Sequence, residues 1–194
     1  MKSEAPTSPE SQQTAEAELV QRVLDGDAAA ARQVVGQHLG PITGFAFRML
    51  GDAAEAEDVA QETFLRLWRD LPRWEPRARL STWLHRVAHN LCIDRLRANR
   101  TTPLDAASDP VDPRAGAPAQ MEELQRSRAV AAALAELPER QRAAVTLVYH
   151  QGLSNREAAE VLGVDVDALE SLLARGRRGL RKRLVDSAQA DRAG

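Results

Sequence analysis

The spacing of apolar residues follows a helical period along most of the chain and is clearest in residues 138–184. Pro138 is typical of a helix start, while Gly152 and Gly163 are typical of helix ends. The last segment carries apolar or small residues at helical spacing: Leu169, Leu172, Leu173, Gly176, Leu180 and Leu184. This pattern predicts two short helices followed by a longer one, which is the order of a helix-turn-helix.

Polar residues support this prediction. Ser154 and Glu157 have the spacing of a capping box, and Asp165 is placed to cap the long helix. That helix ends in a basic run with no acid inside it: Arg175, Arg177, Arg178, Arg181, Lys182 and Arg183. A long basic helix after two short ones favours binding in the DNA major groove. The alternative is a small helical hairpin whose basic end is only solvated.

Upstream of residue 101 the pattern also predicts helices. They cover residues 16–24, 27–39, 42–50 and 52–72, and a last helix begins with Ser81 or Thr82 as its cap. The fourth segment should bury Ala60, Phe64, Leu67, Trp68 and Leu71 and expose Asp58, Gln61, Glu62, Leu65 and Arg69. The last should bury Leu84, Val87, Ala88 and Leu91 and expose Trp83, Arg86, Asn90 and Arg97. Strand signals are weak, so the whole chain is expected to be all-α.

Composition divides the chain into two helical domains. Residues 101–120 contain four prolines among small and acidic residues, which cannot form a core. We expect a flexible tail at 1–14, a domain at 15–100, a linker at 101–120, a domain at 121–187 and a second tail at 188–194.

The net charge of −2 hides basic regions. Residues 63–100 hold nine basic and three acidic side chains, and residues 126–194 hold twelve and nine. The remaining segments are acidic. A polyanion could therefore contact the chain at two separate places.

Other function classes have little support. One cysteine, Cys92, excludes an internal disulfide and fits a reducing cytoplasm, where we expect this protein. The apolar runs are too short to span a bilayer. His85 and His89 have metal-ligand spacing, but Arg86 stands where the zinc motif needs Glu. No nucleophile motif or phosphate loop occurs, so we expect no enzyme, no metal and no cofactor.

The segment 73–79 (RWEPRAR) mixes one aromatic residue with three arginines and leads into a helix showing Trp83, Arg86 and Asn90. Aromatic rings stack on bases, arginine binds phosphate, and asparagine bonds a base edge. These residues favour contact with single-stranded DNA. The alternative is that Trp74 and Trp83 are core residues.

Four stretches together resemble a known family. Residues 58–69 (DVAQETFLRLWR) and 81–97 (STWLHRVAHNLCIDRLR) resemble region 2 of a bacterial sigma factor. Residues 137–143 (LPERQRA) and 152–163 (GLSNREAAEVLG) resemble region 4. With no other region present, the chain is similar to the extracytoplasmic-function (ECF) group of the sigma-70 family.

The resemblance implies that the protein binds core RNA polymerase, directs it to promoters and helps to open the duplex. It implies polymerase contact through Asp58, Gln61, Glu62, Leu65 and Trp68. It implies −10 element contact through Arg73, Trp74, Arg77, Arg79, Ser81, Trp83, Arg86 and Asn90. It implies −35 element contact through Ser154, Asp167, Glu170, Ser171, Ala174, Arg175, Arg177 and Arg178. An anti-sigma factor is the expected inhibitory partner.

One departure from the family pattern concerns the start of the −35 helix. Most relatives carry a basic residue, a serine and another basic residue there, whereas this chain has Glu170, Ser171 and Leu172, preceded by Asp165 and Asp167. Two alternatives stay open. One is a helix-turn-helix regulator that acts without polymerase, and the other is an adaptor that keeps the fold but not the DNA contact.

Overall fold

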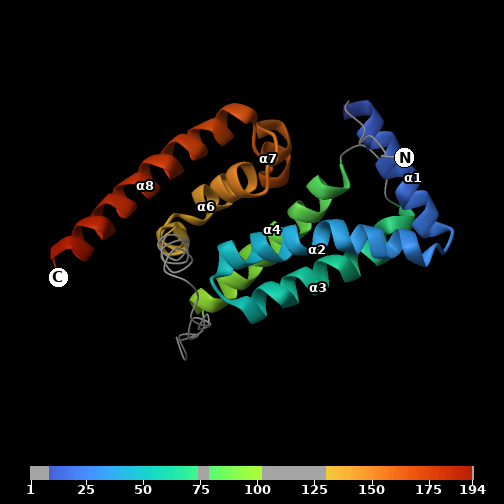
Figure 1. Ribbon diagram of the computed structural model, residues 1–194, viewed down its shortest axis with the longest axis horizontal. Helices are drawn as coiled ribbons and strands as arrows, with labels where there is room; N and C mark the ends of the chain where they lie inside the picture. The colour runs from blue at the N-terminus through green and yellow to red at the C-terminus, as the bar shows by residue number, and fades with distance from the viewer. Residues whose placement is uncertain (1–8, 74–78, 102–129, 194) are drawn as a thin grey trace, which may run out of the picture.

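The computed structural model describes residues 9–73, 79–101 and 130–193, and in these ranges the chain is helical with short connections and no strand (Figure 1). The all-α prediction is therefore confirmed. The predicted linker lies outside the described residues except for Thr101. The first helix begins at Pro9, inside the predicted N-terminal tail, and the last ends at Ala193, beyond the predicted domain end at residue 187.

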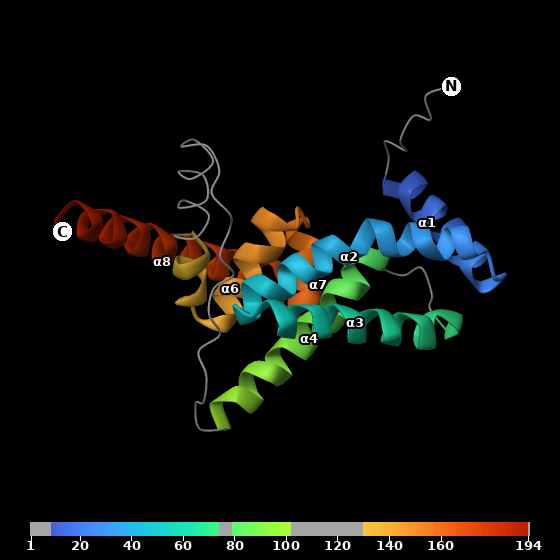
Figure 2. The same cartoon turned by 60° about the horizontal axis from the view of Figure 1, so that its bottom comes forward.

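The N-terminal helices form one group around a shared core. They are α1 (Pro9–Leu24), α2 (Ala28–Leu50), α3 (Ala53–Asp70), the 3₁₀ turn η1 (Leu71–Arg73) and α4 (Leu80–Thr101). α2 packs against both α3 and α4, while the second half of α4 projects away from them (Figure 2). Side chains with no more than 1 % exposure fill this core: Ile42, Phe45, Met49, Leu67 and Leu84. The predicted core stripes of α3 and α4 are confirmed, although Trp68 and Val87 are only partly buried.

The predicted break between residues 27–39 and 42–50 is wrong, because α2 continues through Pro41. A proline inside a helix removes one backbone hydrogen bond and normally kinks or ends it. Here Ile42 and Phe45 extend the buried stripe that begins with Ala30 and Val34, so packing against the core favours one continuous helix. Asp27 caps the start of α2, accepting from the amide of Ala29 at 2.8 Å.

The predicted cap of α4 is also wrong. The helix begins at Leu80, and Thr82 is buried within the first turn instead of preceding it. A carboxylate oxygen of Glu16, in α1, accepts from the Leu80 amide at 3.2 Å. One open amide at this helix start is therefore satisfied by a residue from elsewhere in the chain.

The C-terminal group has the predicted helix-turn-helix order. It contains α6 (Glu139–Val145), the π-helical turn η2 (Thr146–His150), α7 (Asn155–Leu162) and α8 (Val166–Ala193). The capping box is confirmed: the Glu157 amide donates to Ser154 Oγ at 3.3 Å, and the Ser154 amide donates to the Glu157 carboxylate at 2.8 Å. Gly163 ends α7 with a left-handed φ of 62°, and Asp165 Oδ1 accepts from the Ala168 amide at 2.6 Å.

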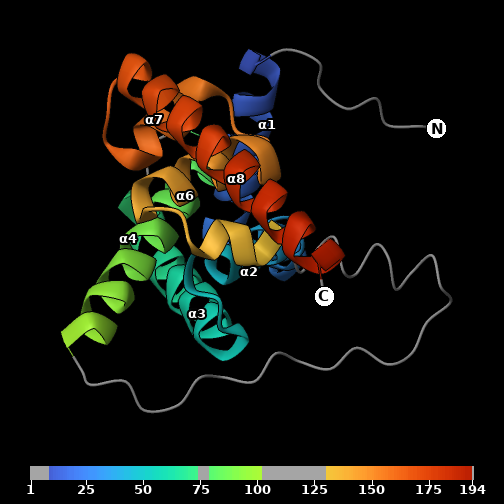
Figure 3. The ribbon, with the colours of Figure 1, turned by 90° about the vertical axis from the view of Figure 1, so that its left-hand side faces the viewer.

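Two glycines bring α8 close to α6, which it crosses on the outside of this group (Figure 3). A Cβ at Gly176 would lie 2.7 Å from a Val145 methyl, and one at Gly179 would lie 2.7 Å from a Leu137 methyl. Neither position has room for a larger residue without movement of its neighbour. Together with buried Leu169 and Leu173, these glycines form the inner face of α8.

The two groups contact one another. α7 packs on α4, and α6 and η2 pack on α2. The buried guanidinium of Arg142 donates hydrogen bonds to the carbonyl of Met49 in α2 and to the carbonyls of Ala135 and Leu137. Because one side chain joins both groups, their relative position is fixed by specific contacts and not by the intervening chain alone.

Candidate functional site

The face of α3 predicted to bind polymerase is exposed. Asp58 and Gln61 are on the surface, and the side chain of Leu65 is 57 % exposed. Glu62 is partly covered and accepts from Arg66 Nε at 2.8 Å. Trp68 is half-buried, with its ring tilted against Phe64 at 6.3 Å between centroids. This face therefore combines acidic groups with accessible apolar surface.

A groove of about 500 Å³ runs beside this face, between α2 and α3. Gln61, Leu65 and Trp68 line it from α3, and the α2 wall is made by Val35, Leu39 and Thr43. The α2 residues are absent from the sequence-based site. The apolar face of α2 is wider than its buried stripe, because Val35 and Leu39 lie beside the stripe without being part of it. These extra apolar positions are the sequence signal that could have indicated the α2 wall of the groove.

The predicted −10 face of α4 is accessible along its length. Arg86 and Asn90 are exposed, and Trp83, one and two turns before them, is half-buried. Ser81 is partly buried, and its carbonyl is hydrogen bonded to His85 Nδ1 at 2.8 Å. Trp74 and Arg77 lie outside the described residues.

Arg79, just before α4, lies at the contact between the two groups. Its Nη1 is 3.4 Å from the Glu157 carboxylate of α7. Glu16 lies nearby, and burial raises the pKa of its carboxyl above the ordinary value although the Leu80 hydrogen bond and Arg79 pull it down. Arg79 is thus engaged at the contact between the groups, whereas Arg73 is exposed in η1.

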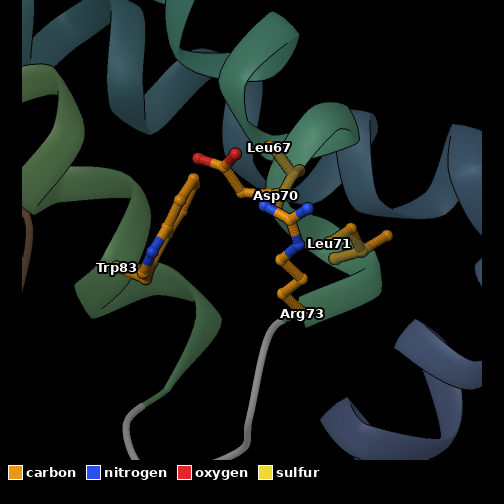
Figure 4. A pocket seen from close by; sticks show the side chains of 5 residues that line it. All are labelled: Leu67, Asp70, Leu71, Arg73 and Trp83. Atoms are coloured by element: carbon orange, nitrogen blue, oxygen red, sulfur yellow. The ribbon is translucent and has the colours of Figure 1, made fainter.

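A pocket of about 310 Å³ lies where α3 ends beside α4 (Figure 4). Trp83 stands on one side of it, and Asp70 and Arg73 stand on the other, with Leu67 and Leu71 as its apolar lining. The hydrogen bond from Arg69, together with the charges of Arg69, Arg73 and Arg66, holds the pKa of Asp70 below its usual value. Sequence reasoning missed Asp70, because only the fold brings it opposite Trp83.

The predicted −35 face lies on the outer side of α8. The side chains of Asp167, Glu170, Ser171, Arg175 and Arg178 are exposed, and Ala174 is partly covered. Ser154 lies at the start of α7 as its cap. Arg177 is also exposed, but its guanidinium donates to the Tyr149 hydroxyl at 3.2 Å. The structure therefore brings most of these residues to one surface of α8, and Arg177 lies beside that surface, hydrogen bonded to Tyr149 of η2.

Glu170 has a partner within the protein. Its carboxylate accepts from the Asn155 side-chain amide at 3.4 Å, which is a long hydrogen bond between two exposed groups. The pair joins the start of α7 to the first turns of α8. Glu170 still has accepting capacity on its solvent side, because a carboxylate offers about four lone-pair positions.

The buried titratable groups of α4 form part of the core. His85 is 3 % exposed and contacts the edge of Phe45 at 5.7 Å between centroids. Cys92 has no exposed surface and is a core thiol, and burial raises the pKa of this thiol to about 12. Within the described ranges no three His, Cys, Asp or Glu residues gather in a way that could hold a metal ion. No helix there is long and apolar enough to cross a membrane.

Comparison with known proteins identifies both groups of helices. Residues 34–102 match the family described as Sigma-70 region 2, and residues 127–180 match Sigma-70, region 4. The ECF RNA polymerase sigma factor SigW of Bacillus subtilis is 32 % identical over 86 % of this chain and 95 % of its own. SigM of Mycobacterium tuberculosis, also an ECF sigma factor, is 35 % identical over 87 % of this chain and 84 % of its own.

A solved structure is similar over nearly the whole chain. CnrH, solved in complex with the cytosolic domain of CnrY, aligns with a TM-score of 0.68 and 28 % identity. The alignment covers 89 % of this chain and 98 % of CnrH. The family matches, the relatives' coverage and the helical architecture agree, and the chain belongs to the ECF RNA polymerase sigma factors.

Proposed function

We propose that this protein binds core RNA polymerase through the α2–α3 face, directs it to specific promoters, and contacts the −10 element with α4 and the −35 element with α8. The observation that carries the proposal is the presence of both family regions in order, 34–102 and 127–180, on one chain. A sigma factor needs both regions, and a regulator acting without polymerase would not need the α3 face.

The α3 face suits a partner that is basic and partly apolar. Asp58 and Gln61 supply polar contacts, while exposed Leu65 and the groove beside it supply apolar area. Interfaces of this kind bury an apolar centre inside a polar rim. Opposite charges across such a rim steer the encounter and fix its register.

The two DNA contacts differ in charge. On α4, Arg86 and Asn90 combine a phosphate-binding cation with a side chain that bonds base edges. On α8, Arg175 and Arg178 supply the affinity, while Glu170 accepts from a cytosine amino group and so contributes selectivity. Its bond to Asn155 fixes the carboxylate at the surface without consuming all of its accepting positions.

The protein is further proposed to work in the cytoplasm without catalytic activity of its own and to be held inactive by an anti-sigma factor. The family is not a family of enzymes. The partner proposal is supported by CnrH, a protein of similar fold whose structure is a complex with the cytosolic domain of CnrY.

Run-off transcription with core polymerase tests the central proposal. The wild-type protein added to core should start specific transcripts from genomic fragments that core alone does not transcribe. The double variant Asp58→Arg with Gln61→Ala should lose binding to core, because removing one partner of a buried interfacial charge pair costs about 2–5 kcal/mol. Unchanged helicity by circular dichroism would exclude unfolding as the cause.

The chain offers a matched control for this variant. Gln21, in the last turn of α1, and Asp25, which directly follows the helix, are both exposed, and the Gln21 side-chain amide donates to Asp25 at 2.9 Å. Asp25→Arg with Gln21→Ala makes the same chemical change on a different face and should leave transcription intact. Equal losses in both variants would contradict the α3 assignment, and specific DNA binding without polymerase would favour the independent regulator.

A further inference from the structure

The side chains of Tyr149 and Arg177 form a polar pair at the edge of α8. Tyr149 is 52 % exposed, and the Arg177 guanidinium donates to its hydroxyl at 3.2 Å. A guanidinium has no acceptor, so the hydroxyl cannot donate its own hydrogen back to Arg177. The pair therefore presents an O–H donor beside a positive charge. A negatively charged group that only accepts hydrogen bonds, such as a phosphate, matches this arrangement.

The packing of α8 on α6 places Tyr149 beside Arg177. Gly176 has no side chain, and a Cβ there would lie 2.7 Å from a Val145 methyl, so the two helices approach closely at this point. Tyr149 follows Val145 by four residues, in the π-helical turn η2, and contacts the residue that follows Gly176. Turns of this kind are rare and often occur at functional sites. The position of the pair is therefore set by the close approach of the two backbones.

The basic side chains of α8 divide into two flanks. Arg175 and Arg177 stand on either side of buried Gly176, so they leave the helix in opposite directions. Arg181 lies one turn after Arg177 on the same flank, and Lys182 lies two turns after Arg175 on the other. All four basic side chains are exposed. A helix in the major groove has a phosphate backbone on each side, so the two flanks suit the two DNA strands.

We propose that Tyr149 and Arg177 together hold one backbone phosphate of the −35 duplex, with the Tyr149 hydroxyl donating to a phosphate oxygen and Arg177 supplying the charge. This inference rests on the proposed function, because it requires α8 to lie in the groove of promoter DNA. It assigns a DNA contact to a residue of η2, outside α7 and α8. The contact adds affinity and fixes position without selecting a base, because the phosphate is the same at every base.

Replacement of single phosphates tests this contact with the protein assembled with core polymerase. Promoter fragments found by run-off transcription are made with one neutral methylphosphonate at a time across the −35 region. On the unmodified fragment, Tyr149→Phe should weaken promoter binding about fivefold, the value of one hydrogen bond. One replaced phosphate should remove most of the difference between Tyr149→Phe and the wild type. The same phosphate should remove most of the effect of Arg177→Ala.

The salt dependence of binding distinguishes a direct contact from a positioning role. Tyr149→Phe keeps the net charge, so the slope of log affinity against log salt concentration should match that of the wild type. Arg177→Ala removes one phosphate-binding charge and should flatten the slope by about one. If Tyr149 only positioned Arg177, Tyr149→Phe would also flatten the slope, and that result would contradict the direct contact.

Arg140→Ala is the matched control for the lost charge, because Arg140 is an exposed arginine of α6 that lies near His89 of α4. It should keep the affinity and the slope of the wild type. Wild-type affinity in Tyr149→Phe, or an effect of this variant that is equal at every replaced phosphate, would overturn the proposed contact while the wild-type protein still transcribes. Failure of the wild-type protein to transcribe would instead overturn the proposed function.

Discussion

The two helices that begin at the contact between the groups are capped in opposite ways. At the start of α7, Ser154 and Glu157 satisfy each other's backbone amides within four residues. At the start of α4, the amide of Leu80 is satisfied by Glu16, which is 64 residues away. The first cap needs only local sequence, whereas the second exists only after α1 has packed, so α4 depends on tertiary structure for a feature that α7 carries in itself.

The local and the distant cap also differ in the pKa of their carboxyl groups, which belong to Glu157 and Glu16. Burial is the largest influence on both and by itself raises the pKa. In Glu157 the hydrogen bonds from Ser154 and the charge of Arg79 overcome it, and the pKa falls below the ordinary value. In Glu16 the hydrogen bond from Leu80 and the charge of Arg79 do not overcome the effect of burial, and the pKa of the carboxyl is raised. The local cap therefore holds its charge more firmly than the distant one.

The largest expected loss of stability comes from a substitution that breaks the contact between the two groups of helices. Arg142→Ala leaves the carbonyls of Met49, Ala135 and Leu137 without their donor, so the free energy of unfolding should fall by about 3–5 kcal/mol. Urea denaturation followed by circular dichroism measures this loss. Arg140→Ala, at an exposed position two residues earlier, is the control and should cost less than about 0.5 kcal/mol. Similar losses in both variants would contradict the role given to Arg142.

A second, smaller effect concerns acid. Burial lowers the pKa of His38 to about 4, with nearby His85 and Arg79 contributing in the same direction. The unfolded chain therefore binds a proton more readily below pH 6.5, and the free energy of unfolding should fall as the pH drops. Between pH 7 and pH 5 this group accounts for about 2 kcal/mol.

His38→Gln removes this contribution, and comparison of urea midpoints at pH 7 and pH 5 measures it. The variant should lose less stability than the wild type on acidification. His85 and His89, whose pKa values are also lowered by burial, act in the same direction. Glu16 acts in the opposite direction, since a carboxyl with a raised pKa favours the folded state as the pH falls. Equal acid sensitivity in both proteins would exclude His38 as a cause.

The smallest expected loss of stability comes from substitutions in the caps of α7 and α4, which compare the two caps directly. Ser154→Ala should cost about 1 kcal/mol, the usual value for an N-cap. Glu16→Gln should cost less, because the amide oxygen still accepts from Leu80 and no charge has to be buried. Thermal denaturation of both variants compares the two caps. A larger loss in Glu16→Gln than in Ser154→Ala would show that the charge, and not the acceptor, stabilises α4.

Features that depend on nearby residues could be predicted from the sequence, and features that depend on residues far apart in the chain could not. The helix-turn-helix, its capping box and the exposed face of α3 were predictable, because periodicity and caps act over a few residues. The continuation of α2 through Pro41 was not, because core packing of Ile42 and Phe45 outweighs the local preference of proline. The cap of α4 was mispredicted because Ser81 and Thr82 are good local candidates and Glu16 is a distant one.

The sites divide in the same way. The exposure of Leu65 and Asp58 is predictable from one helix alone, since both fall on the side of α3 away from its buried stripe. Asp70 becomes a site residue only when Trp83 of α4 stands opposite it, and Val35 and Leu39 only when α3 completes their groove. A residue whose role depends on a neighbouring helix can be identified only once the fold shows which helices lie side by side.

The glycines on the inner face of α8 separate two properties that a DNA-reading helix must combine. Gly176 and Gly179 allow the helix to rest directly on the buried side chains of Val145 and Leu137. The outer positions, among them Glu170 and Arg178, take no part in that packing. On the proposed function, exchange of outer residues would change promoter preference while the helix keeps its position against α6.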